Sequence, residues 1–407
     1  MNHLWLINQY ANTPEMPGHS RHYELAIGLK NLNWQVEIFS SDFNLSQRAF
    51  KKLNKFNLNF SEVINGTIWH WLRVFPYRKN NWRRIINLLS FCLNVFIFAY
   101  LRFLKSYFKN NQPDIILASS PQLPAAFTLL LLAKLLKKPF ILEVRDLWPQ
   151  VLIDQGGKSP KSYLIRILLF MEKKLYKHSD SIVVLSKGAI KYVKKRSASD
   201  IFWLPNGPDL NKFRFSELPE EKNYFSHKRP FRILYAGAHG EANDLSNIIK
   251  SAKLLLRYPI QFTFIGDGPL KKSLIREANN CNNIIFNDPI PKDDIPEMMH
   301  KYDAILLSLK DVSVFKYGVS PNKLYDAYAV GRPVISTASG EVNLEIEKNN
   351  LGVTSLPNNP EMLSMSIKKL FFLPRIEREI MGINARKLAE EIYSREKIIS
   401  NYDFLLK

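Results

Sequence analysis

The chain has 407 residues, of which 46% are hydrophobic and 12% aromatic, so it holds enough apolar material for about two domains and is not a disordered or low-complexity protein. The formal net charge of +20 is uneven, because residues 1–200 carry a surplus of +17 and residues 201–407 a surplus of +3. Two widely separated cysteines, Cys92 and Cys281, exclude a disulfide framework and a Cys/His zinc pattern, and they favour a reducing cytoplasm.

Short apolar runs alternate with segments of helical period along the chain, which is the pattern of parallel β–α units. The first residues, MNHLWLIN, lack the basic lead-in of a secretory signal and are expected to open the first strand. Expected strands in the first half are residues 4–8, 36–40, 68–72, 114–118, 140–144, 181–185 and 201–204. Those in the second half are 231–236, 261–265, 284–287, 304–308 and 333–336, with helices near 245–257, 269–279, 320–330 and 359–373. We therefore predict two doubly wound α/β sheets joined near residue 206.

Residues 82–109 contain an apolar stretch, 85–104, that is long enough to span about 30 Å as a helix. Its polar residues follow one narrow stripe: Arg83, Asn87, Ser90, Asn94, Arg102 and Lys105. We expect a helix lying in a membrane interface, with the polar stripe in water and the apolar face on lipid or protein; packing in the core is the alternative. A spanning helix would interrupt a domain whose strands continue on both sides. Since residues 51–109 hold eleven basic residues and one acidic residue, an anionic membrane surface is the expected partner.

In doubly wound sheets, ligands bind beyond the carboxyl ends of the strands. The stretch GVSPNKLYD predicts a helix capped by Ser320, with Pro321 in its first turn and free N–H groups that attract phosphate. Lys323 would add a positive charge, and Asp326 would accept hydrogen bonds from sugar hydroxyls. An ordinary capped helix with a Lys323–Asp326 surface pair is the alternative.

Two glycine loops follow strands of the second half. YAGAHGEAN supplies Gly237, His239 and Gly240, and FIGDGPL supplies Gly266, Asp267 and Gly268. Each of these loops alone is equally consistent with a structural turn, but with the helix start at Ser320 they predict a nucleotide or diphosphate site.

Two further loops follow strands of the first half. QYANTPEMPGHSRHYELA contains Gly18 just before an amphipathic helix, and EVRDLWPQ places Arg145 and Asp146 where a strand ends. The Arg145–Asp146 pair is either part of a functional site or an ordinary salt bridge, and the sequence leaves both readings open.

Seven segments carry a resemblance to a known family over nearly the whole chain: PGHSRHYELAIGLKNLNWQVEIFSS, EVRDLWPQ, SIVVLSKG, LPNGPD, ILYAGAHG, FTFIGDGPLKKSL and SPNKLYDAYAVGRPVIST. They resemble retaining GT-B glycosyltransferases of the large family that includes phosphatidylinositol mannosyltransferases. Within it they resemble bacterial O-antigen, capsule and colanic-type transferases, in a subgroup like N-acetylfucosamine transferases. The resemblance implies two Rossmann-like domains facing across a cleft, at residues 1–206 and 207–385, and a C-terminal helix at 386–407 that returns to the first domain.

The resemblance also implies residue roles. Asp326 occupies the place of the second of two family glutamates, which holds the ribose, and Gly318 occupies the place of the first. The family's Arg and Lys after the first strand of the second domain are absent, so Lys316, Lys323 and the helix start would neutralise the diphosphate. The catalytic residues implied are Arg145, Asp146 and Lys323. The donor-binding residues implied are Gly18, Asn206, Gly237, His239, Gly240, Gly266, Asp267, Gly268, Lys316, Ser320, Pro321, Asn322, Lys323 and Asp326. No metal or cofactor is expected.

The expected reaction transfers a sugar, for which an N-acetylated deoxy-amino sugar is one expectation, from a UDP-sugar to a lipid-linked saccharide in surface polysaccharide synthesis. Retention implies that the leaving phosphate helps to take the acceptor proton. The enzyme is expected to be cytoplasmic and peripheral on the inner face of the plasma membrane. A nucleotide-sugar epimerase and a non-catalytic membrane-surface protein are the alternatives. A nucleic-acid partner is not expected, because no reading element accompanies the charge.

Overall fold

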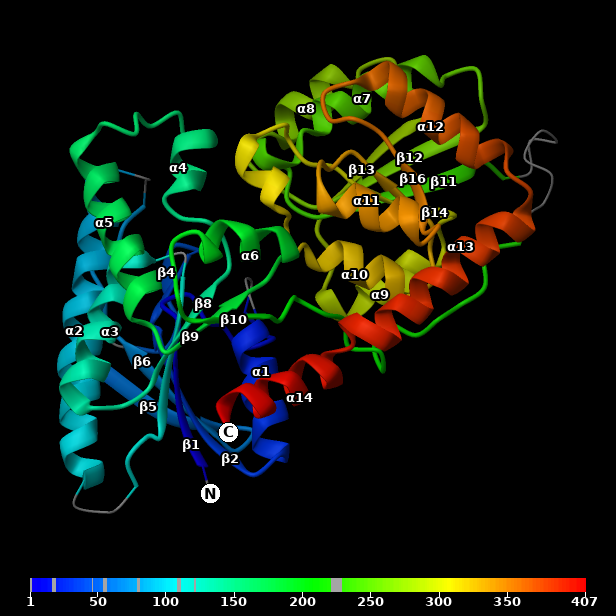
Figure 1. Ribbon diagram of the computed structural model, residues 1–407. Helices are drawn as coiled ribbons and strands as arrows, with labels where there is room; N and C mark the ends of the chain where they lie inside the picture. Colours follow the sequence, from blue (N-terminus) through cyan, green and yellow to red (C-terminus); the bar gives the residue numbers. More distant parts are fainter. Residues whose placement is uncertain are drawn as a thin grey trace. The chain divides into compact units, whose positions relative to one another are not determined.

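The structure is a computed structural model that describes residues 2–16, 20–45, 47–53, 57–78, 81–107, 111–120, 122–220 and 229–407. It divides into two compact units (Figure 1). Unit 1 comprises Met1–Leu204 and Ile399–Lys407, and unit 2 comprises Pro205–Ile398. The boundaries predicted from the sequence were 206/207 and 385/386.

Unit 1 is built on an eight-stranded sheet in the order β10-β9-β8-β7-β1-β2-β6-β5. The strands are β1 Asn2–Ile7, β2 Trp34–Ser41, β5 Asn59–Ile64, β6 Thr67–Leu72, β7 Ile115–Ser119, β8 Phe140–Val144, β9 Ser181–Val184 and β10 Asp200–Trp203. All pairs are parallel except β5 with β6, and a separate antiparallel pair is formed by β3 (Phe43–Asn44) and β4 (Ala49–Phe50). The seven strands predicted for this half are confirmed within two residues at each end, and β5 was not predicted.

The helices of unit 1 are α1 Arg21–Asn31, α2 Trp82–Tyr107, α3 Leu123–Leu136, α4 Gln150–Asp154, α5 Tyr163–His178 and α6 Lys187–Lys194. Helices α2, α3 and α5 lie side by side (Figure 1). The end of α14 (Arg395–Leu406) packs on α1, where Gly28 makes room for it: a Cβ on Gly28 would come within 2.2 Å of Ile399. The indole of Trp34 also donates a hydrogen bond to Asp403, at 2.7 Å. The last nine residues of the chain are therefore part of unit 1.

Unit 2 holds a six-stranded parallel sheet in the order β13-β12-β11-β14-β15-β16. Its strands are β11 Phe231–Ala236, β12 Ile260–Ile265, β13 Ile284–Asn287, β14 Ala304–Leu307, β15 Val334–Ser336 and β16 Gly352–Thr354. Its helices are α7 Leu245–Leu254, α8 Lys271–Glu277, α9 Ile295–His300, α10 Asn322–Ala329, α11 Glu341–Lys348, α12 Pro360–Phe372 and α13 Arg375–Leu388. The core between the sheet, α7 and α12 is apolar and includes Ile248, Phe262 and Ile367. The five predicted strands and four predicted helices are confirmed, and β16 was not predicted.

The two parallel-sheet units confirm the predicted fold class, the α/β architecture of two Rossmann-like domains. In both units the central strands are apolar and buried, because helices cover the faces of a parallel sheet.

Helix α2 corrects one prediction. Arg83 and Lys105 of its polar stripe are exposed, but the other four residues of the stripe bind the rest of unit 1 instead of facing water. Asn87 is fully buried and donates a hydrogen bond to the Phe75 carbonyl at 2.7 Å, and Ser90 accepts one from the Phe75 N–H at 2.8 Å. Asn94 donates to the Arg73 carbonyl. Arg102 forms an ion pair with buried Glu37 at 2.8 Å. The apolar side chains on the other side of the helix are left exposed.

That exposed set comprises Trp82, Ile85, Leu89, Leu93, Ile97, Leu101, Leu104 and Tyr107. Among the described residues, α2 is the one helix that is long and apolar enough to cross a membrane, and 28% of its most apolar stretch is buried. One side of α2 therefore packs on unit 1, with Phe91, Val95 and Ala99 buried, and the other side is exposed. Residues 108 and 109 of the predicted segment lie outside the described part of the chain.

Candidate functional site

The two glycine loops of unit 2 pack backbone against backbone at the carboxyl ends of β11 and β12. The His239 N–H donates to the Asp267 carbonyl at 2.8 Å, and the Gly237 N–H donates to Ile265 at 2.9 Å. A Cβ on Gly266 would lie 2.0 Å from the Gly237 oxygen, and one on Gly268 would lie 2.5 Å from the His239 oxygen. Glycine is therefore required at 266 and 268 for this close approach.

Lys323, in the first turn of α10, reaches these loops. Its Nζ donates to the Tyr235 hydroxyl at 3.1 Å and lies 4.2 Å from the centre of the Tyr235 ring. A Cβ on Gly237 would lie 2.9 Å from Nζ, so the glycine leaves the ammonium group room. The side chain is half-buried, and burial lowers the pKa of Lys323 to about 8. The Lys323–Asp326 surface pair that the sequence left open is therefore not formed, because the ammonium group of Lys323 points to Tyr235.

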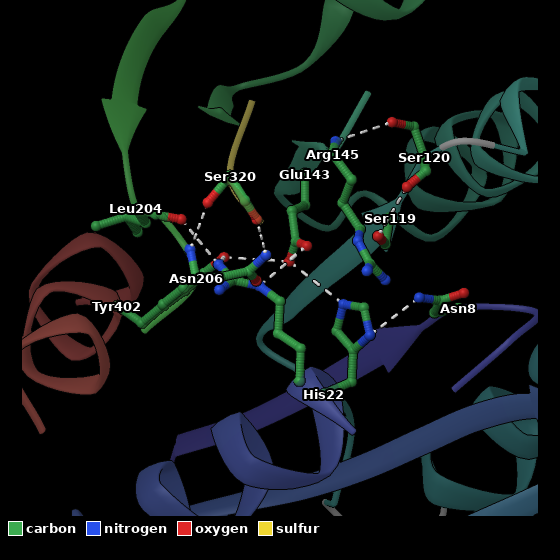
Figure 2. A network of polar contacts seen from close by, with 11 residues as sticks. Asn8, His22, Ser119, Ser120, Glu143, Arg145, Leu204, Asn206, Ser320 and Tyr402 are labelled. Atoms are coloured by element: carbon green, nitrogen blue, oxygen red, sulfur yellow. Dashed lines mark hydrogen bonds and ion pairs between the residues drawn. The ribbon is translucent and has the colours of Figure 1, made fainter. Parts of the chain in front are cut away.

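The start of α10 corrects the prediction for Ser320. The helix begins at Asn322, and its N-cap is Pro321, which makes no side-chain cap. The Ser320 hydroxyl instead accepts a hydrogen bond from the Asn206 N–H at 2.9 Å, and the Asn206 amide donates to the Ser320 carbonyl at 2.6 Å (Figure 2). A polar contact from a distant segment therefore replaces the local cap, and no side chain caps the first turn of α10.

The structure places the remaining predicted donor residues of unit 2 in different surroundings. His239 is fully buried against Tyr235, Phe264 and Phe286, and burial lowers its pKa, so its ring is neutral. Neither ring nitrogen has a hydrogen-bond partner among the described residues. Asp326 is half-buried, whereas Asp267, Lys316 and Asn322 are exposed. Gly240 has open space where a Cβ would stand. Lys323 therefore lies against the glycine loops, whereas no described contact brings Lys316 to them.

A buried charge network lies in unit 1, at the carboxyl end of β8. Glu143 is fully buried and lies 3.4 Å from the Arg21 Nε and 3.3 Å from the His22 Nε2; it also accepts a hydrogen bond from the Tyr402 hydroxyl at 3.1 Å (Figure 2). Burial alone would raise the pKa of Glu143, but His22 and Arg21 outweigh it and hold the pKa well below its usual range. Glu143 is therefore ionised in the folded protein.

The hydrogen bonds around His22 define its protonation. The Asn8 Oδ1 accepts from the Tyr10 N–H at 2.9 Å, so the Asn8 amide group faces the His22 Nδ1, also at 2.9 Å. The Nδ1 is then an acceptor, and the Nε2 carries the proton that points to Glu143. Burial lowers the pKa of His22, which agrees with a neutral ring.

The predicted residues Arg145 and Asp146 follow β8 directly. Arg145 is half-buried beside this network, and its N–H donates to the Ser120 hydroxyl at 3.2 Å; Asp146 is exposed. Two side chains of this kind at the carboxyl edge of a sheet can bind a hydroxyl or an anion. Gly18 lies outside the described residues.

Sequence reasoning did not single out Glu143, His22 or Tyr402. A signal for Glu143 was present, since a charged residue inside the otherwise apolar strand FILEV must be paired when buried. No such signal exists for Tyr402, which is 259 positions from Glu143.

Comparison with known proteins agrees with this architecture. Residues 19–212 match the family described as Glycosyltransferase Family 4, and residues 218–388 match the family described as Glycosyl transferases group 1. A relative from Escherichia coli named for colanic acid biosynthesis, the glycosyl transferase WcaI, is 24% identical over 83% of each chain. One from Pseudomonas aeruginosa, named as the glycosyltransferase WbjE, is 23% identical over 79% of this chain and 80% of the relative.

Solved structures share the fold of the whole chain. Sucrose-phosphate synthase from Thermosynechococcus elongatus superimposes with a TM-score of 0.74 at 15% identity, covering 100% of this chain and 98% of its own. Anabaena Alr3699/HepE in complex with UDP and glucose gives a TM-score of 0.68 at 12% identity, over 100% and 99%. WaaG, a glycosyltransferase involved in lipopolysaccharide biosynthesis, gives 0.64 at 12% identity, over 99% of each chain.

Both matched families consist of glycosyltransferases, so the epimerase and the non-catalytic membrane protein considered from the sequence have no support. The chain is a glycosyltransferase of the GT-B fold, composed of a Glycosyltransferase Family 4 domain followed by a Glycosyl transferases group 1 domain.

Proposed function

We propose that the enzyme transfers a sugar, with retention, from a UDP-sugar bound by unit 2 to a lipid-linked saccharide bound by unit 1, in the synthesis of an O-antigen or capsule. The relatives named for colanic acid and lipopolysaccharide synthesis support a surface polysaccharide as the product. The Anabaena protein in complex with UDP and glucose supports UDP as the carrier. The N-acetylfucosamine-type subgroup that the sequence resembles makes a deoxy-amino sugar the donor sugar we propose.

The observation that carries the donor assignment is the position of Lys323. Its ammonium group stands at the uncapped start of α10, against the backbone of the glycine loops at Gly237, and has no carboxylate partner among the described residues. A half-buried ammonium group and a helix N-terminus both favour a diphosphate. We assign the nucleotide diphosphate to this cluster, with Asp326 on the ribose hydroxyls.

The chemistry follows from charge. When the glycosidic bond to the diphosphate breaks, negative charge develops on the leaving oxygen, and fixed positive groups stabilise that transition state more than the ground state. Lys323 and the start of α10 supply these groups, so the proposal assigns this role to the protein and to no metal or cofactor. The leaving phosphate then helps to take the acceptor proton, while Arg145 and Asp146 at the end of β8 orient the acceptor hydroxyl.

We further propose that unit 1 lies on the inner face of the plasma membrane through an apolar face. This apolar face consists of the exposed residues of α2 named above, Leu131 and Leu135 of α3, and Tyr163, Leu164 and Phe170 of α5. The basic residues Lys134, Arg166, Lys173 and Lys177 of α3 and α5 are also exposed. The three helices contain one acidic residue, Glu172, and it is buried. An apolar face flanked by cations and free of exposed acids fits an anionic lipid surface.

The donor proposal is tested by thermal unfolding of the full-length protein with a panel of UDP-, GDP- and TDP-sugars. We expect a UDP-sugar to stabilise the wild type, and Lys323→Met to lose both this stabilisation and turnover while remaining folded. Lys348→Met, which removes an exposed lysine of α11, is the matched control and should behave as the wild type. Stabilisation of Lys323→Met by the same nucleotide sugar to the wild-type extent would refute the assignment.

A further inference from the structure

Three side chains of the unit 1 sheet form a chain of short hydrogen bonds, which we call the Ser61 relay: Ser61, His70 and Glu37. The Ser61 Oγ lies 2.7 Å from the His70 Nδ1, and the His70 Nε2 lies 2.7 Å from the Glu37 Oε2. Glu37 is fully buried and His70 is 3% exposed, whereas Ser61 is exposed. The relay therefore runs from the core of unit 1 to a serine that a solute can reach.

The strand pairing explains how these residues meet. Ser61 of β5 and His70 of β6 are direct partners in an antiparallel pair, so their side chains project from the same face of the sheet. Helix α2 covers that face, where Phe98 packs on the His70 ring with 5.1 Å between ring centres. Arg102 of the same helix donates to both oxygens of Glu37, at 2.8 and 3.1 Å. Helix and sheet thus hold His70 and Glu37 in one orientation.

The proton positions follow from the charge of Glu37. Burial alone would raise the pKa of Glu37, but His3, His70 and Arg102 outweigh it and hold the pKa well below its usual range. An ionised carboxylate only accepts hydrogen bonds, so the His70 Nε2 carries a proton. In the neutral ring the Nδ1 is then an acceptor, and the Ser61 hydroxyl donates to it. His70 is therefore placed to take the hydroxyl proton when Ser61 attacks an electrophile.

Two features beside Ser61 suit an acyl group. β5 ends the strand order of the sheet, and an antiparallel pair turns alternate N–H groups of such an edge strand away from its partner. One outward N–H group therefore belongs to Ser61 or to the residue next to it, and it can donate to an oxygen that becomes negative. Val63, two residues along on the same face, is 69% exposed and offers an apolar contact.

We propose that Ser61 is a nucleophile toward carboxylic esters with short apolar acyl groups. The Ser61 Oγ bonds to the ester carbonyl carbon while its proton passes to the His70 Nδ1. The bond from that carbon to the alcohol oxygen then breaks, and His70 gives the proton to the leaving alcohol, so the acyl group stays on Ser61. Water attacks this acyl group by the same route and releases the carboxylic acid and the free serine. Glu37 keeps its charge throughout and stabilises the imidazolium ring that forms.

The first experiment treats the full-length enzyme with a fluorophosphonate probe and follows each serine by peptide mass spectrometry. The serine oxygen bonds to phosphorus, fluoride leaves, and a base takes the proton. The internal reference is Ser159, an exposed serine of unit 1 whose Oγ accepts from the Lys161 N–H at 3.2 Å. We expect general-base assistance to label Ser61 about 100-fold faster than Ser159 or more. His70→Gln should slow the labelling of Ser61 by about tenfold or more and leave that of Ser159 unchanged.

Ester hydrolysis provides a second readout. The wild type should hydrolyse p-nitrophenyl butyrate and carry a butyryl group on Ser61 when the reaction is quenched in acid. Ser61→Ala should lose this turnover and remain folded, because it replaces an exposed side chain. Ser159→Ala is the matched control and should hydrolyse the ester as the wild type does.

Three outcomes would each overturn the proposal. Labelling of Ser61 no faster than that of Ser159 would show an ordinary surface hydroxyl, and this comparison within one chain needs no variant to fold. Equal labelling of Ser61 in the wild type and in His70→Gln would show that His70 takes no proton. Equal hydrolysis by Ser61→Ala and the wild type would place the reaction at another residue.

Discussion

Replacing two leucines of α2, in the double variant Leu89→Gln/Leu93→Gln, should release the enzyme from membranes without unfolding it. Leu89 is 56% exposed and Leu93 is 60% exposed. Full burial of a leucine contributes about 1.5–3 kcal/mol, so the exposed part of each contributes about 1–1.5 kcal/mol when a bilayer covers it, and the pair about 2–3 kcal/mol. The vesicle partition coefficient should therefore fall by about 30- to 150-fold.

The assay is co-sedimentation with phosphatidylglycerol vesicles over a range of lipid concentrations, with chemical unfolding of the same proteins. Because both side chains face solvent in the free protein, the free energy of unfolding should change by no more than about 0.5 kcal/mol. Leu344→Gln, at a leucine of α11 that is 63% exposed, is the matched control and should partition as the wild type does. Wild-type partitioning of the double variant, or an equal loss in Leu344→Gln, would refute a membrane contact through α2.

Three further predictions test the Lys323 site with its glycine loops in unit 2 and the Glu143 network in unit 1. UDP binding should take up a proton above about pH 8, because the lowered pKa of Lys323 leaves it partly neutral until the diphosphate restores its charge; calorimetry at about pH 8.5 in buffers of different ionisation enthalpy should detect the uptake in the wild type and not in Lys323→Met. Gly266→Ala should destabilise unit 2 by about 1–3 kcal/mol through its clash with the neighbouring loop, whereas Gly240→Ala, with open space at the Cβ, should leave the melting temperature unchanged; equal effects would contradict the packing described. Tyr402→Phe should cost about 1–2 kcal/mol near neutral pH. Since the pKa of Glu143 lies well below its usual range in the folded protein, Glu143 stays ionised there in mild acid, so the difference between this variant and the wild type should persist from neutral to mildly acidic pH; no difference in urea unfolding at neutral pH would count against the network.

The sheets were predictable because nearly every central strand is a short apolar run between helical segments, and such a run has few other ways to be buried. The sequence reasoning missed β5, because NFSEVI forms neither a continuous apolar run nor a regular alternation; it pairs antiparallel with β6 at the sheet edge and is largely exposed. It also missed β16, which has three residues and gains its strand geometry only from pairing with β15.

The errors at the sites come from contacts between distant segments. Ser320 has the residue type of an N-cap, but Asn206, 114 positions away, takes its hydroxyl. The polar stripe of α2 has the spacing of a solvent face, but partners such as Gln9 lie on loops whose position the helix sequence does not contain. The glycine loops and Lys323 were found because backbone approach and a charge at a helix start both leave a local mark in the sequence. Their role as a donor site stays a prediction.

In helix α2 several polar side chains face the protein and many apolar side chains face outward, and this arrangement affects how the enzyme can be redesigned. A hydropathy profile would advise an engineer to replace Asn87 and Ser90 with leucine in order to strengthen lipid binding, yet both would remove hydrogen bonds that hold the helix to its own protein. The opposite change, polar residues at the outward leucines, would weaken the proposed contact with lipid and leave the architecture unchanged. On this helix the outward leucines can be edited, whereas the side chains that face unit 1, such as polar Asn87 and apolar Phe91 and Val95, cannot.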